Sequence, residues 1–324
     1  MMITNKKIIE KVKKANNIAI FAHRDPDPDA LGSMFGFGEF CQKMGKNYSI
    51  FAVKKYDNYL NHIFPMDKTK QEFVSDDFDL VVLLDVHSIE RIEVLFQEEV
   101  SKAKDIMIID HHKVSENEKF EFKDAKIMPE MAAASEIVLS LFRDENIKPS
   151  KECATYLYAG LMGDTDRFLH SNLNKTVFED AMFLMQCGAD IQHVYDFMYR
   201  YITKEDIKVN QYLYNNITYL DGGKTAFVIF SIRDMKKLGV GIDAVKEFSN
   251  TLIRIKGVEL SFLIYERVPN EYKISMRSAS VNLVPFSNKM GGGGHPNATG
   301  FSVFYGKTKI KQEIPKWSLE ILNG

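Results

Sequence analysis

Two segments in the first half of the chain are apolar at every position and run directly into a carboxylate. Residues 80–84 read LVVLL before Asp85, and residues 106–109 read IMII before Asp110. An apolar run without alternation is typical of a strand that is buried on both faces, as in a parallel sheet covered by helices. This feature restricts the N-terminal half to an α/β fold in which at least two strands end in acidic side chains.

Strand and helix signals alternate around these two runs. Further strands are predicted at residues 18–21 and 48–53, and helices at residues 30–44, 132–142, 153–161 and 176–186. Alternation of this kind predicts a doubly wound, mostly parallel sheet with helices on its faces.

A second alternation begins after Gly222 and Gly223. It predicts strands at residues 225–232, 258–266, 272–280 and 300–305, and a helix at residues 241–255. The residues between the two blocks are mostly helical and polar. We therefore predict an N-terminal domain over residues 1–187, a helical linker over residues 188–216 and a smaller C-terminal α/β domain over residues 217–324.

The charge balance and the cysteines limit the class of protein. The 324 residues include 42 Lys and Arg and 44 Asp and Glu, and this net charge of −2 argues against a general basic field for long nucleic acids. No apolar run of 18 or more residues predicts a membrane span, and the N-terminus has no apolar signal core. Cys41, Cys153 and Cys187 form no CxxC pair. We expect them to be buried and reduced, in a cytoplasmic protein.

Acidic and histidine side chains follow three of the predicted N-terminal strands. They occupy residues 23–29, 85–87 and 110–112, and residues 163–166 add two aspartates at the end of a predicted helix. Groups just past the carboxyl ends of parallel strands converge on one crevice. Carboxylates and imidazoles without thiolates suit Mn²⁺, Mg²⁺ or Zn²⁺. The pattern therefore predicts a metal centre at this edge of the sheet.

Several carboxylates in one crevice repel each other unless cations neutralise them. Two divalent ions roughly 3.5–4 Å apart, bridged by a carboxylate, form a clamp for in-line phosphoryl displacement by an activated water. Each motif alone has a simpler interpretation, because an Asp-x-Asp pair often only caps a helix, Asp85 could cap a turn, and a histidine pair could be ordinary surface or core. Their joint occurrence at three strand ends favours the metal centre.

The second block carries an anion-binding pattern. The backbone N–H groups of Gly291–Gly294, followed by His295, can point at a phosphate, and Arg277 on a predicted strand can add a bidentate contact. The simpler interpretations are a flexible loop and a solvent-exposed arginine.

These motifs resemble those of the DHH phosphoesterase superfamily with its C-terminal DHH-associated domain. HRDPDPDALGS at 23–33, Asp85, the triplet at 110–112 and GLMGDTDRF at 160–168 are similar to its four N-terminal motifs. RSASVNL from Arg277 and GGGGHPNATG at 291–300 resemble the substrate-binding motifs of the C-terminal domain. Length and domain order look most like the bifunctional oligoribonuclease/pAp phosphatases of the NrnA type.

The resemblance implies a role for each matching residue. One metal ion would be held by His23 and Asp27, the other by Asp29, His111 and Asp164, with Asp85 bridging. Asp110 would orient the neighbouring histidines, and His112 would contact the scissile phosphate. The far end of the nucleotide would be bound by Arg277, Gly292, Gly293, Gly294 and His295.

Three positions depart from the pattern of the superfamily. Asp166 stands where the fourth motif usually has glycine, so an added carboxylate could alter metal affinity or substrate entry. Asp25 is an extra acid in the first motif, and its spacing indicates that it is not a ligand. Thr299 replaces a small residue, a mild change.

The implied function is a phosphoesterase that uses two divalent ions, Mn²⁺ first and Mg²⁺ or Co²⁺ as alternatives. Its substrates would be RNA of about two to five nucleotides, pApA or 3′,5′-pAp. Direct hydrolysis of cyclic di-AMP is the alternative activity, and an inactive nucleotide-binding sensor would need a missing metal ligand, whereas none of the six is missing. Inorganic pyrophosphatases lack the glycine–histidine loop, and a RecJ-type exonuclease would need a further nucleic-acid domain. We expect short RNA or dinucleotides as binding partners, and neither a membrane nor a long nucleic-acid duplex. The sequence does not decide whether the protein forms a homodimer.

Overall fold

The computed structural model describes residues 2–53, 60–114, 122–169 and 173–323, except for the side chains of Asp243, Glu247 and His295. The chain divides into two compact units, residues 1–201 and 202–324. The segment predicted as a linker contributes α8 (Ile191–Tyr195) and the π-helical turn η4 (Asp196–Arg200) to the first unit and α9 (Lys204–Asn215) to the second.

The first unit is built on a parallel sheet of five strands in the order β2-β1-β3-β4-β5. The strands are β1 (Asn17–Phe21), β2 (Asn47–Ile50), β3 (Leu80–Leu84), β4 (Ile106–Asp110) and β5 (Asp124–Ile127). This confirms the α/β fold with a parallel N-terminal sheet. The edge strand β5 was not predicted, because its sequence DAKI is short and half polar.

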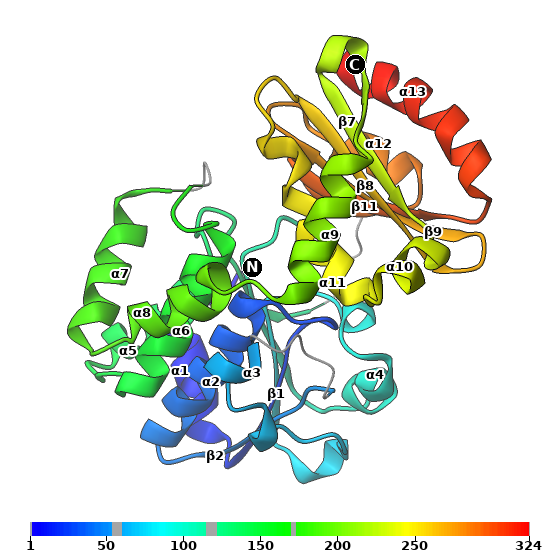
Figure 1. Ribbon diagram of the computed structural model, residues 1–324. Coiled ribbons are helices and arrows are strands. Elements are labelled where there is room, and N and C mark those ends of the chain that lie inside the picture. The colour runs from blue at the N-terminus through cyan, green and yellow to red at the C-terminus, as the bar shows by residue number, and fades with distance from the viewer. Residues whose placement is uncertain (1, 54–59, 115–121, 170–172, 324) are drawn as a thin grey trace. The chain divides into compact units, whose positions relative to one another are not determined.

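Helices cover both faces of this sheet (Figure 1). The helices of this unit before α8 are α1 (Asn5–Lys14), α2 (Pro28–Lys43), α3 (Leu60–Ile63), α4 (Val94–Ser101), α5 (Ala134–Asp144), α6 (Lys151–Asp164) and α7 (Lys175–Gln186), of which α7 packs on α5 and α6. Within β3, Leu80, Val82 and Leu84 join the core with α1, α2, α5 and α6, whereas Val81 and Leu83 join a core of phenylalanines that includes Phe96 of α4. Burial on both faces explains why β3 is apolar at every position.

Close packing of α2 on α6 positions the polar end of the first unit. A Cβ atom on Gly160 of α6 would lie 2.9 Å from Asp29 Oδ1 and also against Ser135 Oγ. Only glycine leaves the space that these two side chains fill. The α2–α6 contact therefore brings the start of α2 and the start of α5 together.

The second unit contains a mixed sheet of six strands in the order β10-β11-β9-β8-β7-β6, in which only the β7–β8 pair is parallel. Its strands are β6 (Thr218–Leu220), β7 (Thr225–Phe230), β8 (Leu260–Val268), β9 (Glu271–Ser278), β10 (Gly293–His295) and β11 (Ala298–Val303). Its further helices are α10 (Ile232–Leu238), α11 (Ile242–Lys246), α12 (Val284–Lys289) and α13 (Lys307–Asn323). Two apolar clusters pack on opposite faces of this sheet.

Two helical features of the second unit differ from expectation. The single helix predicted at residues 241–255 is α11 followed by two 3₁₀ segments, η6 (Glu247–Asn250) and η7 (Leu252–Arg254). The Ser-Asn-Thr sequence at 249–251 explains the break, because these side chains compete for backbone hydrogen bonds. The long helix α13 was not predicted; it carries Pro315 inside it.

Candidate metal centre

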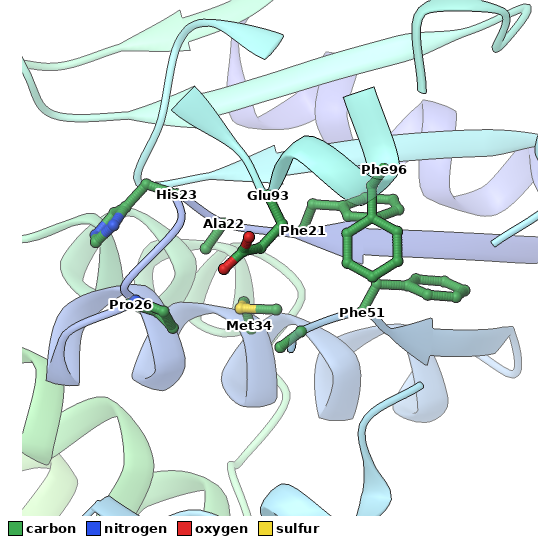
Figure 2. Close-up of a pocket in the computed structure, with 9 residues that line it drawn as sticks. Phe21, Ala22, His23, Pro26, Met34, Phe51, Glu93 and Phe96 are labelled. Carbon is green, nitrogen blue, oxygen red and sulfur yellow. The ribbon is translucent and has the colours of Figure 1, made fainter. Parts of the chain in front are cut away.

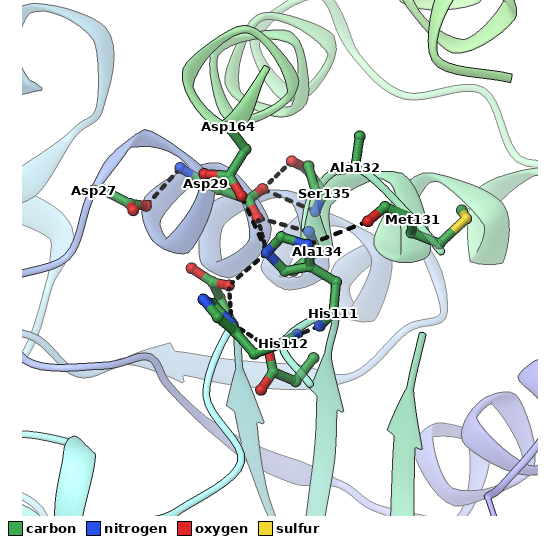
Figure 3. Close-up of polar contacts among 12 residues, drawn as sticks. Asp27, Asp29, His111, His112, Met131, Ala132, Ala134, Ser135 and Asp164 are labelled. Carbon is green, nitrogen blue, oxygen red and sulfur yellow. Dashed lines mark hydrogen bonds and ion pairs between the residues drawn. The ribbon is translucent and has the colours of Figure 1, made fainter. Parts of the chain in front are cut away.

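The predicted ligands of the first unit lie together at the carboxyl edge of its sheet (Figure 3). Asp85 follows β3 directly, Asp110 is the last residue of β4, and His23 comes two residues after β1. Strands β1, β3 and β4 are neighbours, and the strand order reverses beside β1. Ligands bind at such a reversal in open α/β sheets.

The start of α2 supplies two aspartates with different surroundings. Asp27 is the N-cap of α2, and its Oδ1 accepts hydrogen bonds from the backbone N–H groups of Asp29 at 2.9 Å and Ala30 at 3.0 Å. Its other oxygen, Oδ2, lies 3.9 Å from His23 Nε2. Helix capping and metal ligation are therefore compatible in this residue, since each uses a different oxygen.

Asp29 is fully buried and caps a different helix, α5. Its Oδ2 accepts from the backbone N–H of Ala134 at 2.6 Å, and its Oδ1 accepts from the backbone N–H of Ser135 at 3.0 Å and from the Ser135 hydroxyl. The N-cap residue of α5, Ala133, has no side chain that could satisfy these groups. The partial positive charge of this helix N-terminus stabilises the Asp29 carboxylate.

The ligand atoms form groups of metal-binding size. One group is His23, Asp27 and Asp85, a second is Asp29, His111 and Asp164, and a third is Asp85, His111 and His112, each with its ligand atoms within 4.8 Å of one another. Asp85 faces both histidines of the first two groups: its Oδ2 lies 3.4 Å from His23 Nε2 and its Oδ1 lies 3.5 Å from His111 Nε2.

Two buried atoms in this cluster have no hydrogen bond among the residues that the structure describes. They are Asp85 Oδ1 and His111 Nε2. The His111 nitrogen faces three carboxylate oxygens, from Asp164 at 3.0 Å, Asp85 at 3.5 Å and Asp29 at 3.8 Å. A buried nitrogen that faces three carboxylate oxygens and still lacks a well-formed hydrogen bond is unusual in a protein interior. A set of carboxylates and imidazoles with such atoms fits a hard or borderline divalent cation.

The electrostatics of the cluster indicate a strong demand for cations. Burial, together with the negative charge of Asp85, raises the pKa of Asp27 to about 6 and that of Asp29 well above its ordinary value. Burial disfavours protonation of the histidines, yet the surrounding carboxylates outweigh it and raise the pKa of His23 to about 10 and of His111 to about 12. Without a metal ion, protons carry the positive charge that the carboxylates require.

Asp110 organises a separate network behind the ligands. It is fully buried, and its Oδ2 lies 2.6 Å from His87 Nδ1 while its Oδ1 lies 2.8 Å from His112 Nδ1. Its Oδ1 also accepts from the backbone N–H groups of His111 at 2.7 Å and His112 at 3.1 Å. Burial opposes ionisation, but these interactions prevail and hold the pKa of Asp110 far below its ordinary value. The ring of His111 is oriented instead by the Met131 carbonyl, 3.3 Å from Nδ1.

Sequence reasoning placed His87 among the polar residues that follow the strands but gave it no role, and it missed Ser135. His87 is buried and bonded to Asp110, and its only signal is its position two residues after Asp85. Ser135 lies 106 residues away from its partner Asp29 in the chain, so nothing local indicates the contact.

A small pocket adjoins the metal groups on the His23 side (Figure 2). Its lining is Phe21, Ala22, His23, Pro26, Met34, Phe51, Ala52, Glu93 and Phe96. Figure 2 shows the Glu93 carboxylate beside Ala22 and above Met34. Glu93 belongs to none of the three metal-sized groups, so the pocket forms an apolar wall of the centre and contributes no further ligand set.

Arg277 of the second unit lies on β9 and is held by its own neighbours. Its Nε donates to Asn250 Oδ1 at 2.6 Å, its Nη2 donates to Ser249 Oγ at 2.9 Å and its Nη1 donates to the Met276 carbonyl at 2.9 Å. Burial lowers the pKa of this guanidinium. The arginine predicted to bind substrate is thus oriented by side chains of the η6 segment.

The glycine-rich segment is partly a strand. Gly293 and Gly294 belong to β10 and pair with Gly300 and Thr299 of β11, and the Gly292 N–H donates to the Ser287 carbonyl at 2.8 Å. Gly294 has a φ of +139°, and a Cβ there would lie 2.4 Å from the Ala298 carbonyl oxygen. The side chain of His295, a predicted substrate ligand, lies outside the described part of the structure.

Comparison with known protein families identifies both units. The model of the DHH family, N-terminal domain, matches residues 17–161, and the model of the DHHA1 domain matches residues 223–313. The first match contains the strand ends and the α2 and α5 contacts described above.

Named relatives resemble the chain along most of its length. It is 28% identical to the bifunctional oligoribonuclease and PAP phosphatase NrnA of Mycoplasma genitalium over 312 residues, which is 94% of each chain. It is 24% identical to the cyclic-di-AMP phosphodiesterase PdeA of Listeria monocytogenes over 308 residues, covering 88% of this chain but 44% of that protein.

Solved structures support the fold. An exopolyphosphatase-related protein from Bacteroides fragilis superposes with a TM-score of 0.85 at 23% identity, covering 98% of this chain and 95% of that one. RecJ from Thermus thermophilus, in complex with Mn²⁺, superposes with a TM-score of 0.53 at 12% identity, covering 98% of this chain and 53% of that one. None of the helices in the described residues has the length and apolar character needed to cross a membrane. The chain contains, in this order, an N-terminal domain of the DHH family and a DHHA1 domain.

Proposed function

We propose that this protein is a divalent-metal-dependent hydrolase that cleaves phosphate esters of short nucleotides. The observation that carries the proposal is the convergence of four carboxylates and three imidazoles at one edge of the parallel sheet, with two buried atoms among them that lack hydrogen bonds in the described structure. The similarity to an oligoribonuclease and PAP phosphatase supports the nucleotide class of substrate.

The ligand set supports two cation positions. His23 and Asp27 would hold one ion, and Asp29, His111 and Asp164 would hold the other, with Asp85 shared because its two oxygens face the two histidines separately. When bound, two divalent ions supply Lewis-acid activation of a water and of the phosphate. Oxygen and imidazole ligands favour Mn²⁺ over softer metals, and a Mn²⁺ complex of a protein with a similar fold supports that choice.

The network of Asp110 positions the remaining histidine. Asp110 engages His112 Nδ1 at 2.8 Å and so fixes the orientation of the ring. Burial disfavours the charged ring, but Asp110 and Asp85 outweigh it and raise the pKa of His112 above its ordinary value. A protonated His112 would donate a hydrogen bond to the phosphate and stabilise the negative charge that develops there.

The second unit would set substrate length. Arg277 and the backbone of Gly292, Gly293 and Gly294 would bind the distal phosphate or base, and His295 is proposed to join them. The preset guanidinium of Arg277 supports this role, because fixing its orientation beforehand reduces the entropy lost on binding. Substrates such as 3′,5′-pAp, pApA and RNA of a few nucleotides carry the second group that this contact requires.

A hydrolysis panel tests the proposal. The protein would be incubated with Mn²⁺, Mg²⁺ or Co²⁺ and with pAp, pApA, short RNA, cyclic di-AMP or pyrophosphate, and released products would be quantified. We expect Mn²⁺-dependent release of phosphate or nucleotides from the first three substrates. Turnover of pyrophosphate alone, or of none of the five, would contradict the proposal.

Direct hydrolysis of cyclic di-AMP is the second candidate. The similarity to a cyclic-di-AMP phosphodiesterase over 88% of this chain favours including it. The same centre would cut both substrates, so the ratio of kcat/KM for pApA to that for cyclic di-AMP decides between the two. A ratio well above one assigns the linear substrate to this enzyme.

A further inference from the structure

The segment that follows the candidate ligand Asp164 has an unusual backbone. Asp166, Arg167 and Phe168 have φ values of +40°, +63° and +61°, three consecutive residues in the left-handed region without a glycine. Such conformations are unfavourable for side-chain-bearing residues and persist where surrounding contacts enforce them, often at ligand sites.

Hydrogen bonds to the end of α6 enforce this turn. The backbone N–H of Arg167 donates to the Met162 carbonyl at 3.0 Å, and that of Asp166 donates to the Gly163 carbonyl at 3.0 Å. The hydroxyl of Thr165, a fully buried residue, donates to the Leu161 carbonyl at 2.7 Å and accepts from the Phe168 N–H at 3.2 Å. The turn is therefore fixed to the same helix end that presents Asp164.

The turn directs the Arg167 side chain onto an aromatic ring of the first unit. The guanidinium carbon lies 4.7 Å from the centre of the Tyr199 ring, within cation–π range. Tyr199 belongs to the π-helical turn η4, and its hydroxyl donates to the Met162 carbonyl at 3.1 Å. The backbone N–H of Arg167 and the hydroxyl of Tyr199 thus bond to the same carbonyl, two residues before the candidate ligand Asp164, so both residues are tied to this end of α6.

Asp166 gives the guanidinium a single-oxygen partner. Arg167 Nε and Nη2 donate to the same atom, Asp166 Oδ1, at 3.2 Å and 3.0 Å. A guanidinium has five N–H donors and pairs best with two oxygens of one anion. Sharing one oxygen between adjacent residues leaves this arginine able to make a better-matched pair with a phosphate.

We propose that Arg167 is a phosphate-binding residue of the catalytic centre, where it contacts the phosphate being cleaved, and that Asp166 holds it in a resting position. The inference rests on the proposed function, since it names a further ligand of the same substrate group. The neighbouring exposed arginine Arg200, which pairs with Asp196 on the outside of the same π-helical turn, is a matched control.

Binding of inorganic phosphate to the Mn²⁺-loaded protein, followed by calorimetry, tests the inference without turnover. We expect Arg167→Ala to raise the Kd for phosphate about tenfold or more, because a charge-assisted bidentate contact is lost. Arg167→Lys should lie between wild type and Arg167→Ala, and Arg200→Ala should match wild type. Asp166→Asn should bind phosphate about two- to fivefold more tightly, since a competing partially exposed ion pair is removed.

Hydrolysis of bis-p-nitrophenyl phosphate gives a second readout. We expect Arg167→Ala to lower kcat/KM about 10- to 100-fold, and added guanidinium ion to restore part of it, which a purely structural role would not allow. Unchanged phosphate affinity in Arg167→Ala, or a parallel loss of Mn²⁺ binding, would overturn the inference. If the wild-type protein cleaved no ester, but Arg167→Ala still bound phosphate more weakly than wild type, the proposed function would fail and the phosphate site would stand.

Discussion

The two units of this protein prepare their polar groups in different ways. In the first unit, Asp85 Oδ1 and His111 Nε2 are buried without hydrogen bonds in the described structure, and they belong to clusters of side chains that could hold a cation. In the second unit, Arg277 already makes three hydrogen bonds within its own domain. We therefore expect the proposed metal ions to bind tightly in the first unit, and the proposed substrate to bind exchangeably in the second, where its contacts must compete with existing hydrogen bonds.

The largest test of this contrast is the removal of Asp85. We expect Asp85→Ala to lose nearly all turnover, by about 10³-fold or more, because the two cation positions no longer share a ligand. Circular dichroism should show an intact fold, and Asp76→Ala, a change of an aspartate whose side chain is 84% exposed, should leave activity unchanged. Full activity in Asp85→Ala would refute the two-metal mechanism.

A smaller loss is expected when the support behind the ligands is weakened. Asp110→Asn removes the charge that His87 and His112 share, so we expect kcat to fall about 10- to 100-fold. Mn²⁺ binding, measured by electron paramagnetic resonance, should persist because the six proposed metal ligands remain. If Asp110→Asn abolished Mn²⁺ binding altogether, Asp110 would itself be a ligand.

Substitution of Arg277 in the second unit should change KM rather than kcat. We expect Arg277→Ala to raise KM for pAp or pApA about tenfold, the usual scale for a charge-assisted contact, and to leave KM for bis-p-nitrophenyl phosphate unchanged. Arg267→Ala, on the neighbouring strand β8 and 53% exposed, is the matched control. Equal effects on both substrates would contradict a distal contact.

The smallest effect is a local gain in stability on metal loading. Mn²⁺ at about 100 times its Kd should stabilise the first unit by about 2.7 kcal/mol per site. Hydrogen exchange should therefore slow at the backbone amides of Ala134 and Ser135, which bond to Asp29, and remain unchanged along β10 and β11. If hydrogen exchange slowed equally in both units, Mn²⁺ would not stabilise the first unit selectively, and the expected difference between the units would be wrong.

The sequence allowed the first unit to be predicted better than the second. Strands β3 and β4 are buried on both faces, so their residues are apolar throughout and their ends are marked by Asp85 and Asp110. The segment at 241–255 lacks so strong a constraint, and side-chain competition at residues 249–251 divides it into short helical pieces.

The clustering of the proposed metal ligands was predictable because parallel topology brings strand ends together, whatever their separation in the chain. The contacts that orient them were not predictable in the same way. Asp29 accepts a hydrogen bond from Ser135, which is 106 residues away in the chain. The His111 ring contacts the backbone carbonyl of Met131, and a backbone contact of this kind cannot be predicted from the type of residue. Local sequence motifs thus indicate which residues are candidate metal ligands, whereas the orientation of these side chains depends on packing between helices that are distant in the chain.

The backbone of Asp85 limits which inactive variant is suitable for trapping a bound nucleotide. Its φ of +55° places it in the left-handed region, where asparagine and aspartate are tolerated better than other side-chain-bearing residues. Alanine there carries a cost of about 1 kcal/mol from its backbone alone. Asp85→Asn keeps the shape of the loop after β3 while removing the carboxylate charge, so substrate complexes for crystallography are better prepared with the amide than with the truncated side chain.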